Sequence, residues 1–159
     1  MQKTKNKLVS GFTIIELLIV IAIIAILAGV VLVNFQGAQA KARDSQRLSD
    51  VRGLQAKLEE YYQANNGYPN TFTAATYPGI DPTTISDPKG RNIVINTVVA
   101  DKTAADGVAA PTAASSSDYL YVPYGTTGCT TTCTGYEIKA YIEKPTTQTP
   151  NPYIKYSLN

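Results

Sequence analysis

The segment from residue 11 to residue 33, GFTIIELLIVIAIIAILAGVVLV, constrains this chain more than any other part of it. Its one charge is Glu16. The uncharged run from Leu17 to Val33 is about 17 residues long, enough to cross a hydrocarbon core of roughly 30 Å. A carboxylate inside such a span costs about 2.5–3.5 kcal/mol on insertion scales. We therefore expect a membrane-spanning helix whose glutamate has a dedicated cationic partner.

The residues before this segment, MQKTKNKLVS, carry three lysines and no acid. Positive charge before an apolar run keeps that end in the cytoplasm, so we expect the chain after Val33 to lie outside. An ordinary secretory signal peptide is the alternative, because Ala38-Gln39-Ala40 resembles a signal peptidase site. The length of the apolar run and the presence of Glu16 argue against that alternative.

Composition argues against an enzyme and against a nucleic-acid-binding protein. The chain has 159 residues, a formal net charge of +2 and no histidine. The lack of histidine removes Ser–His and Cys–His catalysis as well as imidazole metal sites. No Walker, Rossmann or G-x-S-x-G pattern is present, and no Lys/Arg-rich cluster is interleaved with aromatic residues. We expect no catalytic residue, no cofactor, no metal ion and no nucleic-acid site.

Two cysteines, Cys129 and Cys133, frame the short sequence CTTTC. They cannot complete a closed zinc site without histidine or further cysteines. They are therefore either free thiols in a reducing compartment or a small disulfide loop outside it. Because the basic leader places this part of the chain outside the cytoplasm, we predict the disulfide.

A helical pattern continues well beyond the apolar segment. No proline occurs between Gly11 and Tyr68, and Asn65-Asn66-Gly67 followed by Pro69 is a helix stop. We predict a helix from about residue 12 to residue 65, apolar all round in its first half and one-sided in its second, with weak surface pairs at 47/50 and 57/60. One apolar stripe recurs at spacings of three and four: Leu48, Val51, Leu54, Leu58 and Tyr61/Tyr62.

After Pro69 the sequence indicates short strands and loops. We predict strands at 92–99, 119–124, 136–143 and 153–158, with an exposed loop over 103–117. Tyr136, Ile138, Ala140 and Ile142 alternate with more polar residues over 136–143, which is typical of a half-buried strand: Glu137, Lys139, Tyr141 and Glu143. Such strands would pack one face on the helical stripe. The predicted fold class is α+β, a long N-terminal helix packed on a small, mostly antiparallel β-sheet.

The order of these features resembles the type IV filament superfamily, the pilins and pseudopilins with a class III signal peptide. That order is a short basic leader, Gly11-Phe12, a glutamate at the fifth position after this glycine, and a long helix bearing a small β domain. Two segments carry the resemblance, GFTIIELLIVIAIIAILA and RDSQRLSDVRGLQAKLEEYYQANNGYP. The second is similar to the end of the helix in major pseudopilins of type II secretion and in some pilins. The resemblance covers residues 1–70 and, beyond them, only the layout.

The resemblance implies cleavage between Gly11 and Phe12 by a membrane prepilin peptidase on the cytoplasmic side, with N-methylation of Phe12. Cleavage creates an α-amine, which stays cationic at neutral pH after methylation. The Phe12 amine of one subunit would pair with Glu16 of its neighbour and set the axial register between them. The alternative is that Glu16 snorkels to the membrane edge.

The resemblance also implies an organisation and a set of partners. Residues 1–11 would be the cleaved leader, 12–33 the transmembrane and filament-core helix, 34–66 an amphipathic extension and 67–159 an extracellular β domain. The partners would be further copies of the chain, the prepilin peptidase and N-methyltransferase, membrane lipid before assembly, and the assembly machinery. The chain would begin as a single-pass membrane protein with a cytoplasmic N-terminus and end in an extracellular or periplasmic filament.

The chain departs from the family pattern at several positions. Ser10 precedes Gly11 where many members have lysine, and Val33 stands where type IV pilins often carry proline. The Cys129–Cys133 loop is far shorter than the C-terminal loop of type IVa pilins. The aspartates in the β region lack calcium-loop spacing: Asp101, Asp106 and Asp118.

The expected function is that of a major pilin of a type IV pilus. A major pseudopilin of type II secretion is the alternative, and a DNA-uptake pilin is a lesser one. A membrane-anchored extracellular binding module that never polymerises is the rival from another class.

Intact-mass analysis of the mature protein tests this interpretation. We expect a chain that begins at Phe12, carries one added methyl group and lacks the two hydrogens lost in the Cys129–Cys133 bond. A chain that begins at Lys41 would instead indicate an ordinary signal peptide.

Overall fold

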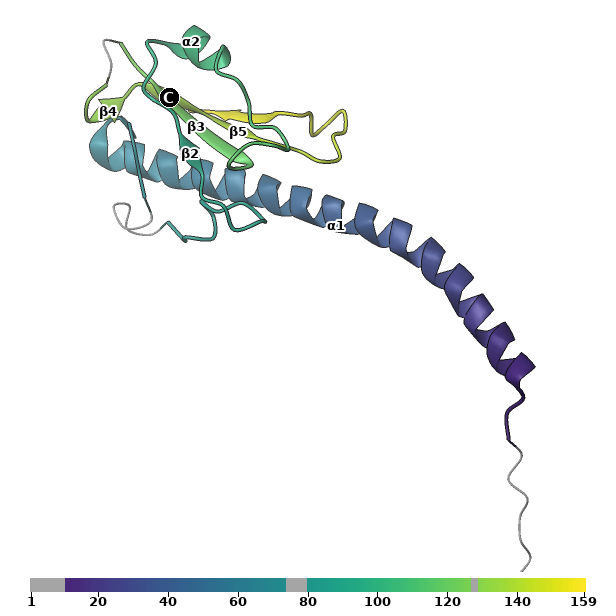
Figure 1. Ribbon diagram of the computed structural model, residues 1–159. Coiled ribbons are helices and arrows are strands. Elements are labelled where there is room, and N and C mark those ends of the chain that lie inside the picture. The colour runs from purple at the N-terminus through teal and green to yellow at the C-terminus, as the bar shows by residue number, and fades with distance from the viewer. Residues whose placement is uncertain (1–10, 74–79, 127–128) are drawn as a thin grey trace, which may run out of the picture. The chain divides into compact units, whose positions relative to one another are not determined.

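The computed structural model describes residues 11–73, 80–126 and 129–159 (Figure 1). The chain divides into two compact units, Met1–Gln39 and Ala40–Asn159. One helix, α1 (Ile14–Asn65), contributes to both. The predicted helix is thus confirmed, and so is the α+β class. Each unit is described separately below.

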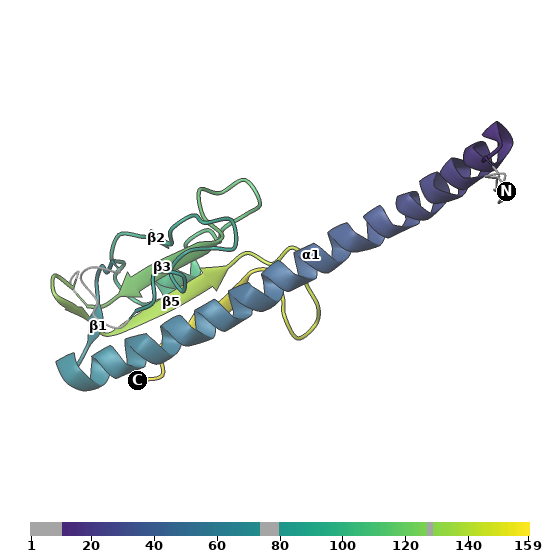
Figure 2. The ribbon, with the colours of Figure 1, turned by 90° about the horizontal axis from the view of Figure 1, so that it is seen from below.

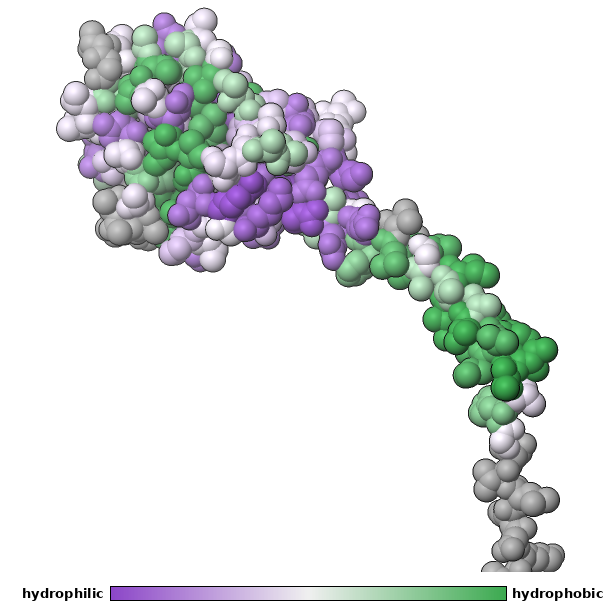
Figure 3. Space-filling model, in the orientation of Figure 1, coloured by the Kyte–Doolittle hydropathy of each residue, from purple (hydrophilic) through white to green (hydrophobic). Residues whose placement is uncertain are grey.

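In the first unit, the side chains of α1 that the structure describes are exposed on every face. The large apolar side chains from Ile14 to Leu32 are between 48% and 81% exposed, and Figure 3 shows this segment as a continuous apolar surface. By length and composition α1 could cross a membrane, a test that an N-terminal signal sequence also passes. An apolar surface of this extent needs lipid or other protein to cover it.

In the second unit, the predicted stripe of α1 packs on a sheet. Val51, Leu54 and Leu58 are buried, and Tyr61 and Tyr62 are half-buried beside them. Figure 2 shows these later turns of α1 running alongside β3 (Tyr119–Tyr124) and β5 (Gly135–Ala140). The sheet side chains in the shared core are Tyr119, Tyr121, Tyr136, Ile138 and Ala140.

The main sheet has the strand order β2-β3-β5-β6, with β2 at Val94–Ile95 and β6 at Tyr153–Tyr156. The β3–β5 and β5–β6 pairs are antiparallel, and the β2–β3 pair is parallel. The strand predicted at 92–99 is shorter because its backbone also pairs with residues outside the sheet, for example in the hydrogen bond from Ile93 N to Ile85 O. The strand predicted at 136–143 ends at Ala140, beyond which Ile142 N donates to the Asn151 side chain.

Two predictions about the outer face of the sheet are wrong. Segment 103–117 is not simply a loop, because it begins within α2 (Lys102–Asp106), which lies on the side of the sheet opposite α1 (Figure 1). As a result, β5 is buried on both faces rather than on one. The ammonium group of Lys139 donates to the carbonyls of Ala105 (2.8 Å) and Val108 (2.7 Å) and lies 3.2 Å from the Glu137 carboxylate. A lysine that binds main-chain carbonyls near a helix end can be buried where the alternation predicts solvent.

A second, two-stranded sheet closes the end of α1, and it was not predicted. Its strands are β1 (Tyr68–Pro69) and β4 (Thr132–Cys133). The predicted disulfide between Cys129 and Cys133 is present, with a Cα–Cα distance of 5.0 Å. Asn70 Nδ2 donates to Thr130 O at 2.6 Å. A Cβ on Gly67 would lie 2.7 Å from that of Thr132, so the approach of the disulfide loop to the helix end requires glycine there.

Candidate processing and assembly site

The predicted processing residues lie immediately before α1, and a capping box fixes where the helix begins. The Glu16 carboxylate accepts hydrogen bonds from Thr13 N at 2.9 Å and Thr13 Oγ1 at 2.7 Å. Glu16 N donates in turn to Thr13 Oγ1 at 3.3 Å. This reciprocal pairing satisfies donors that a helix N-terminus otherwise leaves unpaired. The Thr-x-x-Glu pattern could have revealed it from the sequence.

The cap leaves the predicted scissile bond outside the helix. Gly11 and Phe12 have no regular secondary structure, and the Phe12 side chain is 89% exposed. Exposed backbone without internal hydrogen bonds is where proteases act most readily. The structure therefore places Gly11, Phe12 and Glu16 within one short segment. The pairing of Glu16 with a Phe12 amine needs a cleaved chain and stays a prediction.

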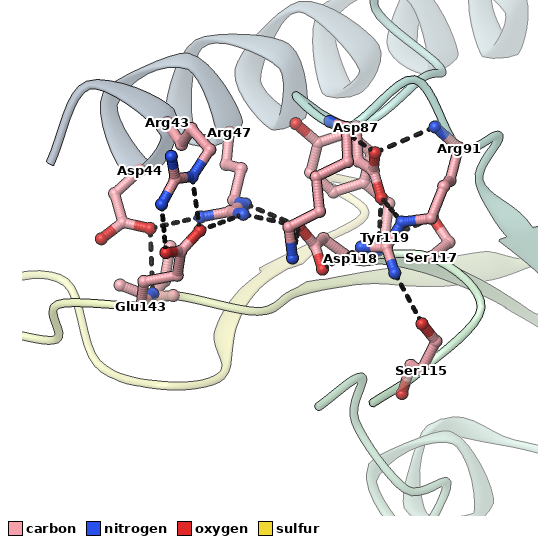
Figure 4. A network of polar contacts seen from close by, with 12 residues as sticks. Arg43, Asp44, Arg47, Asp87, Arg91, Ser115, Ser117, Asp118, Tyr119 and Glu143 are labelled. Atoms are coloured by element: carbon pink, nitrogen blue, oxygen red, sulfur yellow. Dashed lines mark hydrogen bonds and ion pairs between the residues drawn. The ribbon is translucent and has the colours of Figure 1, made fainter. Parts of the chain in front are cut away.

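In the second unit, a network of ion pairs that we did not predict surrounds Arg47, whose side chain is fully buried (Figure 4). Its guanidinium pairs with Asp44 at 2.6 Å, with Asp118 at 2.5 Å and with Glu143 at 2.7 Å. Arg43 forms a bidentate ion pair with Glu143, in which Nε and Nη2 donate to the two carboxylate oxygens at 2.8 and 2.7 Å. The network therefore joins the first turns of α1 in this unit to two distant loops.

A third arginine extends the network. Arg91 pairs with Asp87 at 2.7 Å and with Asp118, and Lys89 lies 3.5 Å from Asp118. The four cations and four carboxylates are balanced in charge: Arg43, Arg47, Lys89 and Arg91 against Asp44, Asp87, Asp118 and Glu143. Burial of charge is tolerated when each ion has partners of opposite sign.

Of the two predicted surface pairs, one is present. Lys57 pairs with Glu60 at 2.7 Å. The predicted pairing of Arg47 with Asp50 is wrong, because Arg47 turns into the network and Asp50 accepts a hydrogen bond from Tyr119 Oη at 2.7 Å.

Glu59 anchors the C-terminal residues to α1. Its carboxylate accepts hydrogen bonds from the hydroxyls of Tyr68 (2.7 Å) and Tyr136 (2.9 Å). Leu158 N and Asn159 Nδ2 donate to the same carboxylate at 3.2 and 3.0 Å. Burial raises the pKa of Tyr136, and the carboxylate beside it acts in the same direction, so this tyrosine remains a donor.

The aspartates considered for calcium binding have other roles. Asp101 caps α2 by accepting from Ala104 N at 2.8 Å, Asp106 pairs with Lys102 at 2.9 Å, and Asp118 belongs to the network. Within the described ranges, no group of three or more His, Cys, Asp or Glu side chains could hold a metal ion.

The N-terminal segment of the chain matches a known family model. Residues 6–32 match the model of the prokaryotic N-terminal methylation motif. The chain is 36% identical over 89 residues to the type II secretion system core protein G of Aeromonas hydrophila, which is 56% of this chain and 60% of that protein. These matches support the assignment of the chain to the type IV pilin and pseudopilin superfamily. No solved structure matches it.

The relatives fall into both branches of the superfamily. The chain is 41% identical over 70 residues to a type IV major pilin protein, PilE1, of Neisseria gonorrhoeae, covering 44% of this chain and 42% of that pilin. A second PilE1 sequence is 36% identical over 107 residues, covering 65% of this chain and 48% of the relative. The chain thus spans about half the length of the curated relatives that it matches.

Substitution of Arg47 tests the network. We expect Arg47→Met to lower the free energy of unfolding of the detergent-solubilised chain by about 3–5 kcal/mol, because Asp44, Asp118 and Glu143 lose a buried partner. Arg52→Met, an exposed position on the same helix, should change it by less than about 0.5 kcal/mol. Chemical denaturation measures both, and equal effects of the two substitutions would contradict the assignment.

The network should also give stability a defined dependence on pH. The Arg43 guanidinium, aided by Arg47, lowers the pKa of Glu143 from its usual 4.5 to about 2. A depressed folded-state pKa contributes stability above pH 4.5 that is lost as the pH falls through 2. The stability difference between the wild type and Glu143→Gln should therefore shrink over this interval. Denaturation at several pH values, with Glu60→Gln as control, checks it; a constant difference would contradict it.

Proposed function

We propose that this chain is a structural subunit of a type IV-like filament. The observation that carries the proposal is the exposure of the apolar first half of α1 on every side, together with one carboxylate near its start. Residues 12–33 would lie in the membrane while the subunit is stored, with the N-terminus in the cytoplasm and the β domain outside. In the filament, the same residues would pack on the helices of other copies.

Cleavage of the leader would prepare the subunit to move from the membrane into the filament. The peptidase would cut the accessible bond between Gly11 and Phe12 and methylate the new terminus. The Phe12 amine would then supply the cation for Glu16 of a neighbouring copy, offsetting the cost of an unpaired carboxylate in an apolar core. The Thr13 donors satisfy Glu16 until that partner arrives. The role is structural rather than catalytic, and no cofactor is needed.

Within the superfamily we favour the major pilin of a type IV pilus. The exposed threonine-rich loop at 145–149 and the absence of a calcium-loop pattern support it. The major pseudopilin of a type II secretion system is the second candidate, supported by the core protein G relatives and by Val33 in place of proline.

A DNA-uptake pilin has less support. This role would use the cations of the β region: Lys89, Arg91, Lys102, Lys139, Lys144 and Lys155. Four of them are engaged, since Lys139 is buried, Lys89 and Arg91 pair with Asp118, and Lys102 pairs with Asp106. Lys144 is exposed and Lys155 is half-buried. A DNA-binding surface needs such groups free to contact phosphates.

Glu16→Leu separates the filament from a binding module that never polymerises. If the carboxylate pairs between copies, the variant should insert in the membrane at least as well as the wild type, because a charge is removed from the span, yet form few or no filaments. Electron microscopy of the source cells and carbonate-resistant membrane association measure the two effects. Ile15→Leu, a conservative change at the adjacent position, is the control. Normal filaments in Glu16→Leu would overturn the proposal.

The same strain distinguishes the two candidate machines. Loss of surface appendages supports the pilus, whereas accumulation of normally secreted proteins inside the cell supports the secretion pseudopilus.

A further inference from the structure

At the end of the second unit where α1 enters it, the acidic side chains are turned inward. The Asp44 carboxylate accepts hydrogen bonds from Glu143 N (2.9 Å) and Lys144 N (2.8 Å) in addition to pairing with Arg47. The side chains of Asp44 and Glu143 are only 9% and 18% exposed. Their negative charge is therefore neutralised within the protein by Arg43 and Arg47.

The cations at this end are more exposed. Lys41 and Lys144 are both exposed, and neither forms an ion pair with any residue that the structure describes. Arg43 is bound to Glu143, but 32% of its side chain remains accessible. Lys41 lies one turn before Asp44 on α1, and the backbone of Lys144 is bonded to the Asp44 side chain. Two exposed lysines thus lie near Asp44, one a turn before it on α1 and one bonded to it through its backbone, whereas Arg43 is paired with Glu143.

These cations come soon after the predicted membrane span. Lys41 follows Val33 by eight residues on the same helix, which is about 12 Å at 1.5 Å per residue. The headgroup layer adds roughly 5–8 Å to each side of the hydrocarbon core. The flexible side chain of Lys41 can span most of the distance between its own backbone and the headgroup layer. Any gap that remains between its ammonium group and the lipid phosphates is within a Debye length of about 8 Å.

We propose that Lys41 and Lys144 form a basic collar that binds the phosphates of anionic phospholipid headgroups while the subunit is stored in the membrane. The collar rests on the proposed function, because it requires residues 12–33 to lie in the bilayer. Its contacts hold the second unit close to the membrane surface, and they must break when the subunit leaves for the filament. Lipid phosphate is the expected partner because Lys41 follows the predicted membrane span by only eight residues of the same helix.

Amine labelling of the full chain in lipid nanodiscs tests the collar. With phosphatidylglycerol in the discs, an acylating reagent should modify Lys41 and Lys144 about fivefold more slowly than in pure phosphatidylcholine discs, since each cation near an anionic surface gains about 1 kcal/mol. Salt at about 1 M should abolish the difference. Lys155 is the internal control and should react equally in both discs.

A matched pair of variants gives a second readout. In phosphatidylglycerol discs, the amides of 40–46 and 143–147 should exchange hydrogen more slowly than in phosphatidylcholine discs. Lys41→Gln/Lys144→Gln should abolish this protection. Arg52→Gln/Lys155→Gln, which removes the same charge elsewhere on the second unit, should retain it.

The outcomes separate the two proposals. Equal labelling of Lys41 and Lys144 in both kinds of disc, with the chain inserted and resistant to carbonate extraction, overturns the collar and leaves the filament proposal standing. Failure of the chain to insert overturns membrane storage and the collar together. Protection by inorganic phosphate added to phosphatidylcholine discs would assign the site to free anions and overturn the choice of lipid.

Discussion

The first half of α1 sets the conditions for everything else in this protein, because nothing in the described part of the chain covers it. Its large apolar side chains are about half or more exposed on all faces, so it needs an apolar surrounding. In the proposed function that surrounding is first the membrane and then the polymer. An unpaired charge is energetically costly in either apolar surrounding. The only carboxylate in the segment is held by Thr13 at the first turn, at the end where cleavage would create a new amine.

The second half of the same helix has a different requirement, since it must hold a β domain in one fixed position. Apolar contacts from Val51, Leu54 and Leu58 supply adhesion, but they tolerate small shifts along the helix. The Arg47 network specifies position, because a buried guanidinium that misses its carboxylates is far more costly than a displaced leucine. At the other end, the disulfide loop and the Glu59 contacts close the helix. The helix is therefore held at both ends of its packed region.

The helix, its stripe, β3 and the disulfide could be predicted from the sequence because each depends on neighbours in the chain. The network could not, because Arg47 and Asp118 are 71 residues apart and Arg43 and Glu143 are 100 apart. The burial of the outer face of β5 could not be predicted for a related reason, since it depends on a segment distant in the sequence. Glu137 and Lys139 have the alternation of a solvent-facing edge, and only the folded position of α2 covers them. The capping box at Thr13 and Glu16 was readable, since its residues are three apart.

The relatives include both pilins and secretion proteins. The methylation motif spans residues 6–32 and so ends within the apolar first half of α1. The match to core protein G covers 56% of the chain, and the match to one PilE1 covers 44%. If the chain is a filament subunit, we expect the features that suit it to one machine to lie on the surface of the second unit, where a residue can change without altering the apolar first half of α1. The loop at 145–149, the cover formed by α2 and the exposed Lys41 and Lys144 are such surface features.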